Sequence, residues 1–180
     1  IALGGFPEVA LHPMSNRVRA AWCRSYLDTV LAPTNVEPVD DLRRPALLGL
    51  LLEQLAARSA GEIVVADLAR ELAVNQTTIH TYLDALETLY LVRRLPAWTT
   101  SRTNRAKRRP VIQLGDTALA CHLLGETPES LSKPSSPWFG PLLETYVVNE
   151  LAKQAAWCGE PTTLAHYRDR DQREVDVILE

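Results

Sequence analysis

The segment Asp67-Leu-Ala-Arg-Glu-Leu-Ala-Val-Asn-Gln-Thr-Thr-Ile-His-Thr-Tyr-Leu83 has the pattern of a helix-turn-helix motif. Ala69 is small at the point where the two helices of such a motif approach each other closely. Val74 is an apolar turn residue that would lie beneath the second helix. Thr77 can cap that helix, because its hydroxyl can accept a hydrogen bond from a free N–H group of the first turn. We therefore predict two short helices joined by a tight turn.

The flanking sequence extends this motif into the order of a winged helix-turn-helix. Apolar residues at helical spacing predict one more helix before the motif, and two strand-like runs separated by a basic loop follow it. The predicted helices are 46–58, 66–73 and 77–89, and the predicted extended segments are 63–65, 90–98 and 110–114.

A winged helix of this kind predicts contact with DNA. The second helix would enter a major groove, and the basic loop would bind phosphates. The predicted contact residues are Gln76, Thr78, His80 and Thr81 on the helix and Arg102, Arg105, Lys107, Arg108 and Arg109 in the loop.

Other interpretations of the same residues stay open. Winged helices also serve as packing or protein-interaction units, and a basic loop is often only solvated. Asp84 and Glu87 count against insertion of the second helix into a groove. His80 and Asp84 are four residues apart and could pair on one helix face.

The remaining chain predicts helices and two further strands. A helix is expected from Ser15 or Asn16 to about Leu31, after a loop over residues 1–14. Prolines mark one linker before residue 46, and a Pro- and Ser-rich stretch marks another at 126–141. Further helices are expected at 116–124 and 142–157, and strands at 164–168 and 173–179.

Composition excludes several classes of protein. No apolar run approaches the ~18 residues that span a bilayer, so no membrane association is expected. Cys23, Cys121 and Cys158 form no CxxC pair, which argues against a disulfide framework or structural zinc and fits a cytoplasmic protein. The first residue is Ile1, and we expect the chain to be a piece of a longer protein.

The end of the chain carries alternating acidic and apolar residues. With a strand period of two, Glu174 and Asp176 would share a face with Ile178 and Glu180. A carboxylate in such a strand can reach Mg²⁺ or Mn²⁺, which prefer oxygen ligands. A solvent-facing edge strand, whose charges hinder aggregation, is the simpler interpretation, and spacing alone favours it.

Short stretches in a fixed order carry a family resemblance over nearly the whole chain. They are Gly4-Gly5-Phe6-Pro7-Glu8, the helix with Trp22, Tyr26-Leu27 and Thr29, Asp67 to Leu72 through Thr81-Tyr82-Leu83, Leu91 to Pro96, Asp116 to Ala120, Leu143 to Leu151, Tyr167-Arg168-Asp169 and Glu174-Val175-Asp176.

In these stretches the chain resembles the C-terminal region of bacterial and archaeal AAA-type P-loop ATPases that carry the domain of unknown function 4143. The resemblance implies that residues 1–45 are a helical tail of an ATPase module, that 46–130 form a winged helix-turn-helix, and that 131–180 begin a PD-(D/E)xK nuclease-like α/β domain. Glu144 and Asp176 would then be metal ligands. The family pattern continues with a Glu-x-Lys strand that this sequence does not contain.

The expected fold class is therefore mainly α with small β elements (α+β), in which a winged helix-turn-helix precedes the partial start of a nuclease-like domain. The sequence has no GxxxxGK[ST] motif, so ATP and Mg²⁺ are expected only for the full-length parent, and no cofactor is expected in this chain.

The expected role is nucleic-acid binding or targeting within an ATPase of unknown process, with double-stranded DNA and the ATPase module as partners. We expect neither ATPase nor nuclease activity from this chain alone. Two alternatives remain: a metal-dependent nuclease domain cut before its lysine, and an interaction scaffold for the ATPase module.

Overall fold

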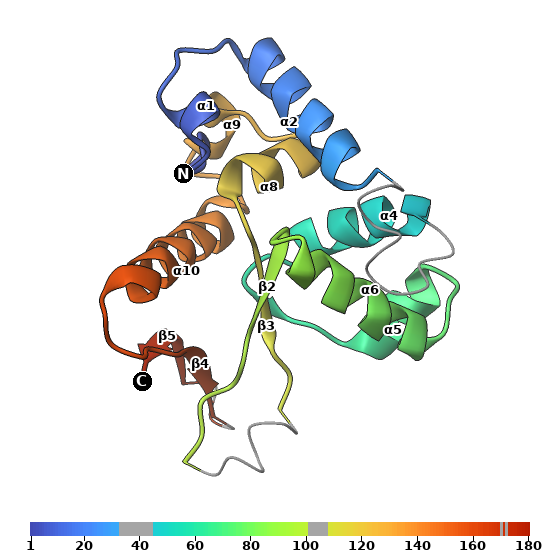
Figure 1. The fold of residues 1–180 in the computed structure, drawn as a ribbon, viewed down its shortest axis with the longest axis vertical. Coiled ribbons are helices and arrows are strands. Elements are labelled where there is room, and N and C mark those ends of the chain that lie inside the picture. Colours follow the sequence, from blue (N-terminus) through green and yellow to red (C-terminus); the bar gives the residue numbers. More distant parts are fainter. Residues whose placement is uncertain (33–44, 101–107, 170, 172) are drawn as a thin grey trace.

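Helices and two small antiparallel sheets alternate along the chain in a computed structural model, which describes residues 1–32, 45–100, 108–169, 171 and 173–180. The expected α+β class is confirmed. In Figure 1 the longest C-terminal helix, α10, lies on one side of the strands β2 and β3, and helices α4, α5 and α6 lie on the other.

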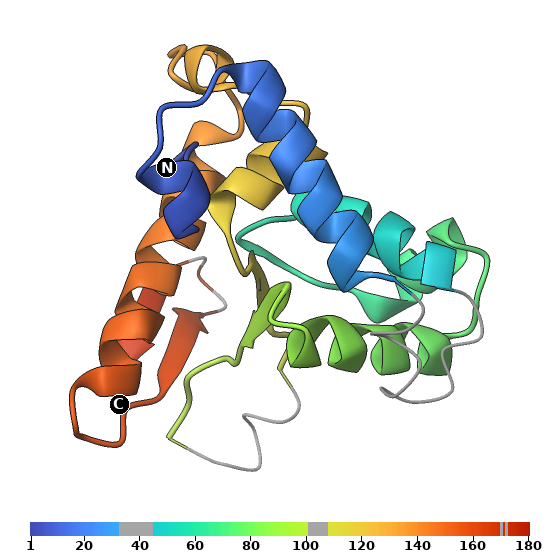
Figure 2. The same cartoon turned by 45° about the horizontal axis from the view of Figure 1, so that its top comes forward.

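The N-terminal segment consists of helices α1 (Pro7–Ala10) and α2 (Asn16–Val30). Of the two predicted starting residues, Ser15 is the cap of α2, since its side chain accepts a hydrogen bond from the Val18 N–H. The loop predicted for residues 1–14 is wrong at α1, where the fixed backbone angle of Pro7 suits the first turn of a helix. Helix α2 packs against α8, as Figure 2 also shows.

The central region follows the predicted order of elements. Its three strands pair antiparallel in the order β1-β3-β2. The elements are α4 (Pro45–Ala56), β1 (Gly61–Glu62), α5 (Val65–Glu71), α6 (Gln76–Thr88), β2 (Val92–Leu95) and β3 (Val111–Leu114).

Two local predictions in this region are wrong. The cap of α6 is Asn75 and not Thr77, because the Asn75 side chain accepts the Thr78 N–H at 2.6 Å. The first strand is formed by Gly61–Glu62 and not by 63–65, because Val65 already begins α5. Asparagine is as good a cap as threonine, and the sequence of the turn alone does not decide between them.

The main core forms where α4, α6 and β3 meet. Leu48, Leu51 and Leu55 of α4 are completely buried, and so are Leu86 of α6 and Ile112 of β3. All four residues of β3 are buried, since this central strand contacts α4, α8 and α10. Strand β3 therefore connects the two sides of the molecule.

Five elements complete the chain. Helix α9 and the first turn of α10 occupy the stretch predicted as a linker, so that prediction is wrong there. The elements are α8 (Thr117–Leu123), α9 (Pro128–Leu131), α10 (Phe139–Trp157), β4 (Leu164–Arg168) and β5 (Glu174–Leu179).

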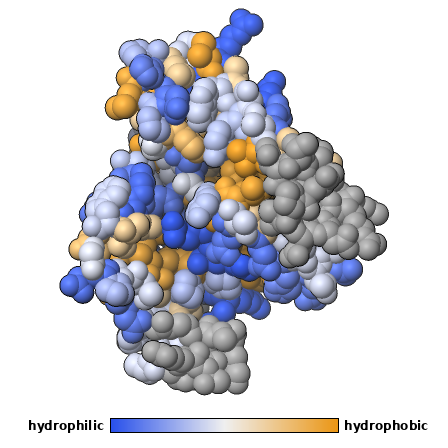
Figure 3. Space-filling view, viewed as in Figure 1, coloured by the Kyte–Doolittle hydropathy of each residue, from blue (hydrophilic) through white to orange (hydrophobic). Residues whose placement is uncertain are grey.

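Helix α10 is anchored to β3 by polar groups as well as apolar ones. Asn149 donates from Nδ2 to the Leu114 carbonyl at 2.8 Å, and Val148 is fully buried. The apolar residues Leu143 and Val147 instead face outward and are about 40% exposed (40% and 41%). Hydrophobic residues reach the surface in Figure 3 on the side where α10 and the β4–β5 hairpin lie.

One buried carboxylate fastens the N-terminal segment to the rest of the chain. Asp116 caps α8, and its oxygens accept the N–H groups of Ala118 at 2.7 Å and Leu119 at 3.3 Å. The same carboxylate accepts the Gly5 N–H at 2.7 Å. A Cβ on Gly4, whose φ is +64°, would lie 2.2 Å from the Asp116 carboxylate. The Gly4-Gly5 pair therefore allows the backbone to reach this acid.

Replacing Asp116 with Ala should destabilise the fold by about 1–3 kcal/mol, because three N–H groups lose their acceptor and α8 loses its cap. Gly4→Ala should also destabilise it, through the clash and the left-handed backbone. Urea unfolding measures both effects, and Asp28→Ala at an exposed position of α2 is the control. Equal midpoints for Asp116→Ala and Asp28→Ala would contradict this role.

Candidate functional site

The four residues predicted to read DNA lie on α6 but are not equally available. Gln76 and His80 are exposed, whereas Thr78 and Thr81 are half-buried. The Thr78 hydroxyl donates to Asn75 Oδ1 at 2.8 Å, so it already has a partner in the helix cap. Gln76 and His80 are thus the side chains of this set that can reach a ligand without rearrangement.

The acidic residues of α6 are neutralised by the neighbouring strand. Arg94 of β2 donates from Nη2 to Asp84 Oδ1 at 2.6 Å and from Nε to Glu87 Oε2 at 2.7 Å. The Arg94 backbone N–H also donates to Glu87 Oε1 at 2.9 Å. Asp84 therefore pairs with Arg94 in place of the suggested His80 partner. These ion pairs reduce the repulsion that Asp84 and Glu87 would exert on a polyanion.

Part of the predicted basic loop is described. Arg102, Arg105 and Lys107 lie outside the described residues, whereas Arg108 and Arg109 are described and exposed.

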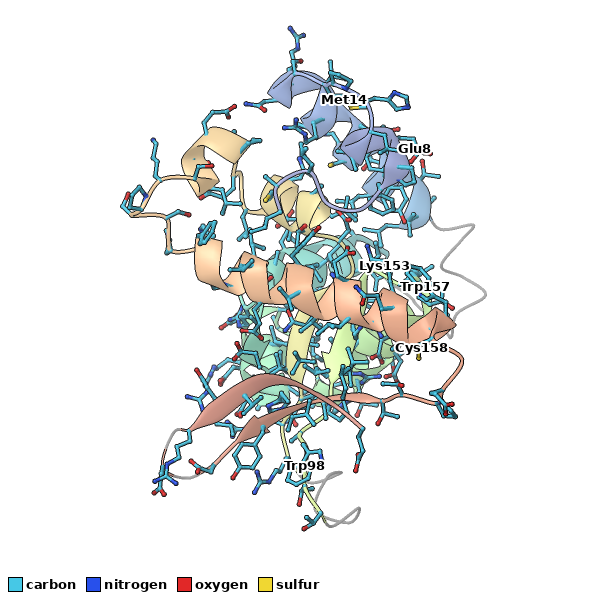
Figure 4. The ribbon with its side chains drawn as sticks, turned by 90° about the vertical axis from the view of Figure 1, so that its left-hand side faces the viewer. Glu8, Met14, Trp98, Lys153, Trp157 and Cys158 are labelled. Atoms are coloured by element: carbon cyan, nitrogen blue, oxygen red, sulfur yellow. The ribbon has the colours of Figure 1, made fainter. Side chains whose placement is uncertain are left out.

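The hairpin formed by β2 and β3 is linked to β4 at the position of His166. The His166 Nε2 donates to the Arg109 carbonyl at 3.2 Å, and its backbone N–H donates to the Pro96 carbonyl at 2.9 Å. The ring is buried, and burial lowers the pKa of His166, so the neutral imidazole is favoured. Trp98 packs on Tyr167 with ring centroids 6.1 Å apart, and Figure 4 shows Trp98 beside the β4–β5 hairpin.

Glu144 and Asp176, the two predicted metal ligands, line one small pocket of about 70 Å³. Glu144 is half-buried on α10, and its Oε1 accepts a hydrogen bond from Gln113 Nε2 at 2.9 Å. Burial, and then the charges of Asp176 and Glu174, raise the pKa of Glu144 to about 7, although the Gln113 bond opposes the shift. The structure thus brings together two carboxylates that are 32 positions apart in the sequence.

The expected alternation along β5 does not hold. The pairing with β4 shifts register between Ala165 and Tyr167, so strand β5 contains an irregularity. As a result Val177 and Ile178 are both half-buried, and neighbouring residues no longer point strictly to opposite faces. The face predicted for Glu174, Asp176, Ile178 and Glu180 is therefore wrong as a single face.

The donor set suits a hydrated divalent cation in charge but offers few ligands. A half-buried carboxyl next to two other acids is the environment that a cation would stabilise. Mg²⁺ commonly binds through one or two carboxylates and keeps several waters, which Glu144 and Asp176 could provide. The described part of the chain has no group of three or more His, Cys, Asp or Glu side chains arranged to hold a metal.

Three residues of this region were missed from the sequence: Gln113, His166 and Arg168. Gln113 could have been recognised from the sequence, because it is the one polar residue in the otherwise apolar strand Val111–Leu114 and a buried amide needs partners. The importance of His166 and Arg168 depends on contacts with β3 and the β2–β3 hairpin, which no local pattern reveals.

Two protein families match this chain, one over its N-terminal part and one over its C-terminal part. Residues 1–130 match the family described as Domain of unknown function (DUF8612), and residues 139–180 match Domain of unknown function (DUF4143). This chain belongs to the DUF8612 family. The DUF8612 match covers the α1–α9 region, and the DUF4143 match covers α10 and the β4–β5 hairpin.

Two mycobacterial relatives align with this DUF8612 chain over nearly its whole length. They are "Uncharacterized protein Rv2008c" of Mycobacterium tuberculosis and "Uncharacterized protein Mb2031c" of Mycobacterium bovis. Each is 33% identical over 178 residues, which is 98% of this chain and 38% of the relative. No solved structure gives a significant match.

These findings confirm one part of the resemblance inferred from the sequence, the domain of unknown function 4143, at residues 139–180. DUF8612 was not anticipated. The AAA-type ATPase parent stays a prediction. Within the described residues, no helix has the length and apolar character needed to cross a bilayer.

The raised pKa of Glu144 predicts a specific pH dependence of stability. Between its ordinary pKa of 4.5 and its folded value of about 7, the folded carboxyl holds a proton that the unfolded chain releases. Stability from this group is therefore present at low pH and is lost as the pH rises toward 7.

We expect the unfolding free energy of the wild type, minus that of Glu144→Gln, to fall between pH 5 and pH 7.5. Urea unfolding at several pH values measures this difference. His166 titrates in both proteins, so its opposite contribution cancels. The exposed Glu53→Gln is the control, and parallel profiles for wild type and Glu144→Gln would contradict the assignment.

Proposed function

We propose that this DUF8612 chain is the nucleic-acid-binding and targeting region of a larger, cytoplasmic AAA-type ATPase. The observation that carries the proposal is the order α4-β1-α5-α6-β2-β3 with sheet order β1-β3-β2. We interpret this order as a winged helix, in which the second helix of the pair would lie in the major groove and the hairpin would contact the backbone.

The side chains around α6 support this choice over a purely structural role. Gln76 and His80 are exposed, and both can exchange hydrogen bonds with base edges or phosphates. Arg94 compensates Asp84 and Glu87, and Arg108 and Arg109 extend cationic charge from the hairpin.

The ATPase in this proposal is a separate module of the longer protein. This chain has no phosphate-binding loop motif, and it spans 38% of the length of its two mycobacterial relatives. ATP and Mg²⁺ would be used by that module, and the present chain would direct it to nucleic acid. The alternative of an interaction scaffold predicts no affinity for DNA at physiological salt.

The proposal predicts salt-sensitive binding to duplex DNA. Arg105→Ala with Arg108→Ala should weaken binding at 100 mM salt and reduce the slope of log K against log salt by about 1 for each phosphate that is no longer neutralised. Fluorescence anisotropy with a labelled 20-base-pair duplex measures both quantities. Arg17→Ala with Arg24→Ala, two exposed arginines of α2, is the matched control.

Changes on α6 should act differently. Gln76→Ala with His80→Ala should lower affinity and leave the salt slope near that of the wild type, because neither side chain is a fixed cation. Absence of duplex binding by the wild type at 100 mM salt would refute the proposed function.

A second candidate, a metal-dependent nuclease-like unit in residues 139–180, is favoured by one observation. Glu144 and Asp176 share a pocket, and burial together with the charge of Asp176 raises the pKa of Glu144. In such a unit a bound cation would polarise a phosphodiester and activate water. Glu144 and Asp176 would hold the cation, and Gln113 would orient Glu144 through its amide.

The metal site can be tested by thermal unfolding without any assay of activity. Mn²⁺ at a tenfold excess over its Kd should stabilise the wild type by about 1.4 kcal/mol at pH 7.5. Glu144→Gln and Asp176→Asn should lose this stabilisation, and the exposed Glu53→Gln should keep it. Equal stabilisation of all four proteins would show that Mn²⁺ binds elsewhere.

A further inference from the structure

We propose that Arg168 of β4 forms a single phosphate-binding groove with Arg108 and Arg109, so that a nucleic-acid strand held by the β2–β3 hairpin continues past the carboxylate pocket. This inference rests on the nucleic-acid binding proposed above. It adds a cation that no pattern near the helix-turn-helix indicates, and it assigns a path to the bound strand.

The groove is open, has a volume of about 350 Å³ and is lined by arginines from both matched family regions. Arg108 and Arg109 lie in the DUF8612 region, and Arg168 lies in the DUF4143 region. All three arginines are exposed, so their guanidinium groups are accessible to a ligand. Guanidinium groups present planar forks of donors that match phosphate oxygens.

The acidic residues of the groove do not cancel this charge. Asp169 is half-buried, and its Oδ1 already accepts the backbone N–H groups of Asp171 at 2.8 Å and Arg173 at 2.9 Å. Glu174 approaches Arg168 only at 3.8 Å, in an ion pair that a phosphate can replace. Glu174 lines the neighbouring pocket and not the groove. Within the groove itself, Glu62 and Asp169 are the two acids beside three arginines.

Hydrogen bonds fix the three arginine positions relative to one another. Arg108 Nη1 donates to the Arg168 carbonyl at 3.0 Å. His166 donates to the Arg109 carbonyl and receives the Trp98 N–H on its own carbonyl. His166 thus acts as a positioning residue that holds the backbone at Arg109 and Trp98 beside β4. The three arginines remain exposed.

The groove leads directly into the pocket that contains Glu144 and Asp176. Glu62, His166 and Arg168 line both the groove and the pocket. A strand whose phosphates follow the arginines would therefore place its next phosphate near Asp176. The open shape and the row of cations suit a continuous phosphate backbone better than a small enclosed metabolite.

Arg168→Ala tests the groove directly. With a fluorescein-labelled 20-base-pair duplex at 100 mM KCl, we expect about 3- to 10-fold weaker binding and a salt slope reduced by about 1. Arg173→Ala, an exposed arginine of the same hairpin, should bind within twofold of the wild type. Arg109→Ala should weaken duplex binding to a similar degree, although it leaves the charges of the β4–β5 hairpin unchanged.

Charge removal at the pocket tests the path of the strand. In EDTA at 50 mM KCl, Asp176→Asn should bind the duplex about 2- to 5-fold more tightly, because one like charge near a phosphate is removed. Asp28→Asn on α2 should leave affinity unchanged.

Two results would overturn the inference while leaving the proposed function intact. The first is wild-type affinity in Arg168→Ala while Arg108→Ala loses binding, and the second is unchanged affinity in Asp176→Asn. If neither the wild type nor any variant binds duplex, the proposed function fails. Titration of sodium pyrophosphate into the wild type then tests phosphate binding by the groove independently. NMR shifts of the Arg109 amide and the His166 ring, lost in Arg168→Ala, would support the groove, and their absence would refute it.

Discussion

The side-chain amide of Gln113 links the two family regions at the carboxylate pocket and holds Glu144 in place there. Gln113 is completely buried in the central strand, so both ends of its amide need partners. Its Nε2 donates to Glu144, and its Oε1 accepts the Thr145 hydroxyl at 2.5 Å. Both partners belong to α10. An apolar residue at this position would leave the Glu144 carboxyl and the Thr145 hydroxyl without this partner on β3.

The same amide explains why Glu144 is balanced between two protonation states. A hydrogen bond from Nε2 favours the carboxylate, whereas burial and the charges of Asp176 and Glu174 favour the neutral acid. Burial and like charge prevail, and the pKa rises to about 7. A cation in the pocket would reverse that balance, because it replaces repulsion between carboxylates with attraction to both.

Local patterns predicted the central elements because each is specified by neighbouring residues. The Asp67–Leu83 segment carries its helix spacing and turn within 17 positions, and its helices lie within two residues of the predicted bounds. The remaining errors lie where the signal is weak or distant. Asn75 and Thr77 are chemically similar caps, so the sequence of the turn does not distinguish them. On α10, polar Thr145 and Asn149 find partners on β3, while apolar Leu143 and Val147 face solvent.

The candidate site could be predicted only in part for a related reason. Spacing identified Asp176 as a carboxylate in a strand and Glu144 as a glutamate on a helix, but their approach to each other depends on the Gln113 contact and on the packing of β4–β5 against Val148. The register shift opposite Ala165–Tyr167 has no marker residue such as glycine or proline on either strand. The register of β5 is therefore set by its pairing with β4 and not by its own residues.

The junction at His166 makes the cationic hairpin and the carboxylate pocket parts of one surface. Its backbone pairs with Ala97 in the segment after β2, and its ring donates to the carbonyl of Arg109, just before β3, so His166 ties β4 to both sides of the β2–β3 hairpin. Because burial lowers the pKa of His166, the imidazole stays neutral and adds no charge between the arginines and the acids. On the proposed path, a nucleic-acid strand would pass from a cationic to an acidic surface across this one neutral residue. That boundary would give a strand bound in the proposed groove a preferred position relative to Glu144 and Asp176.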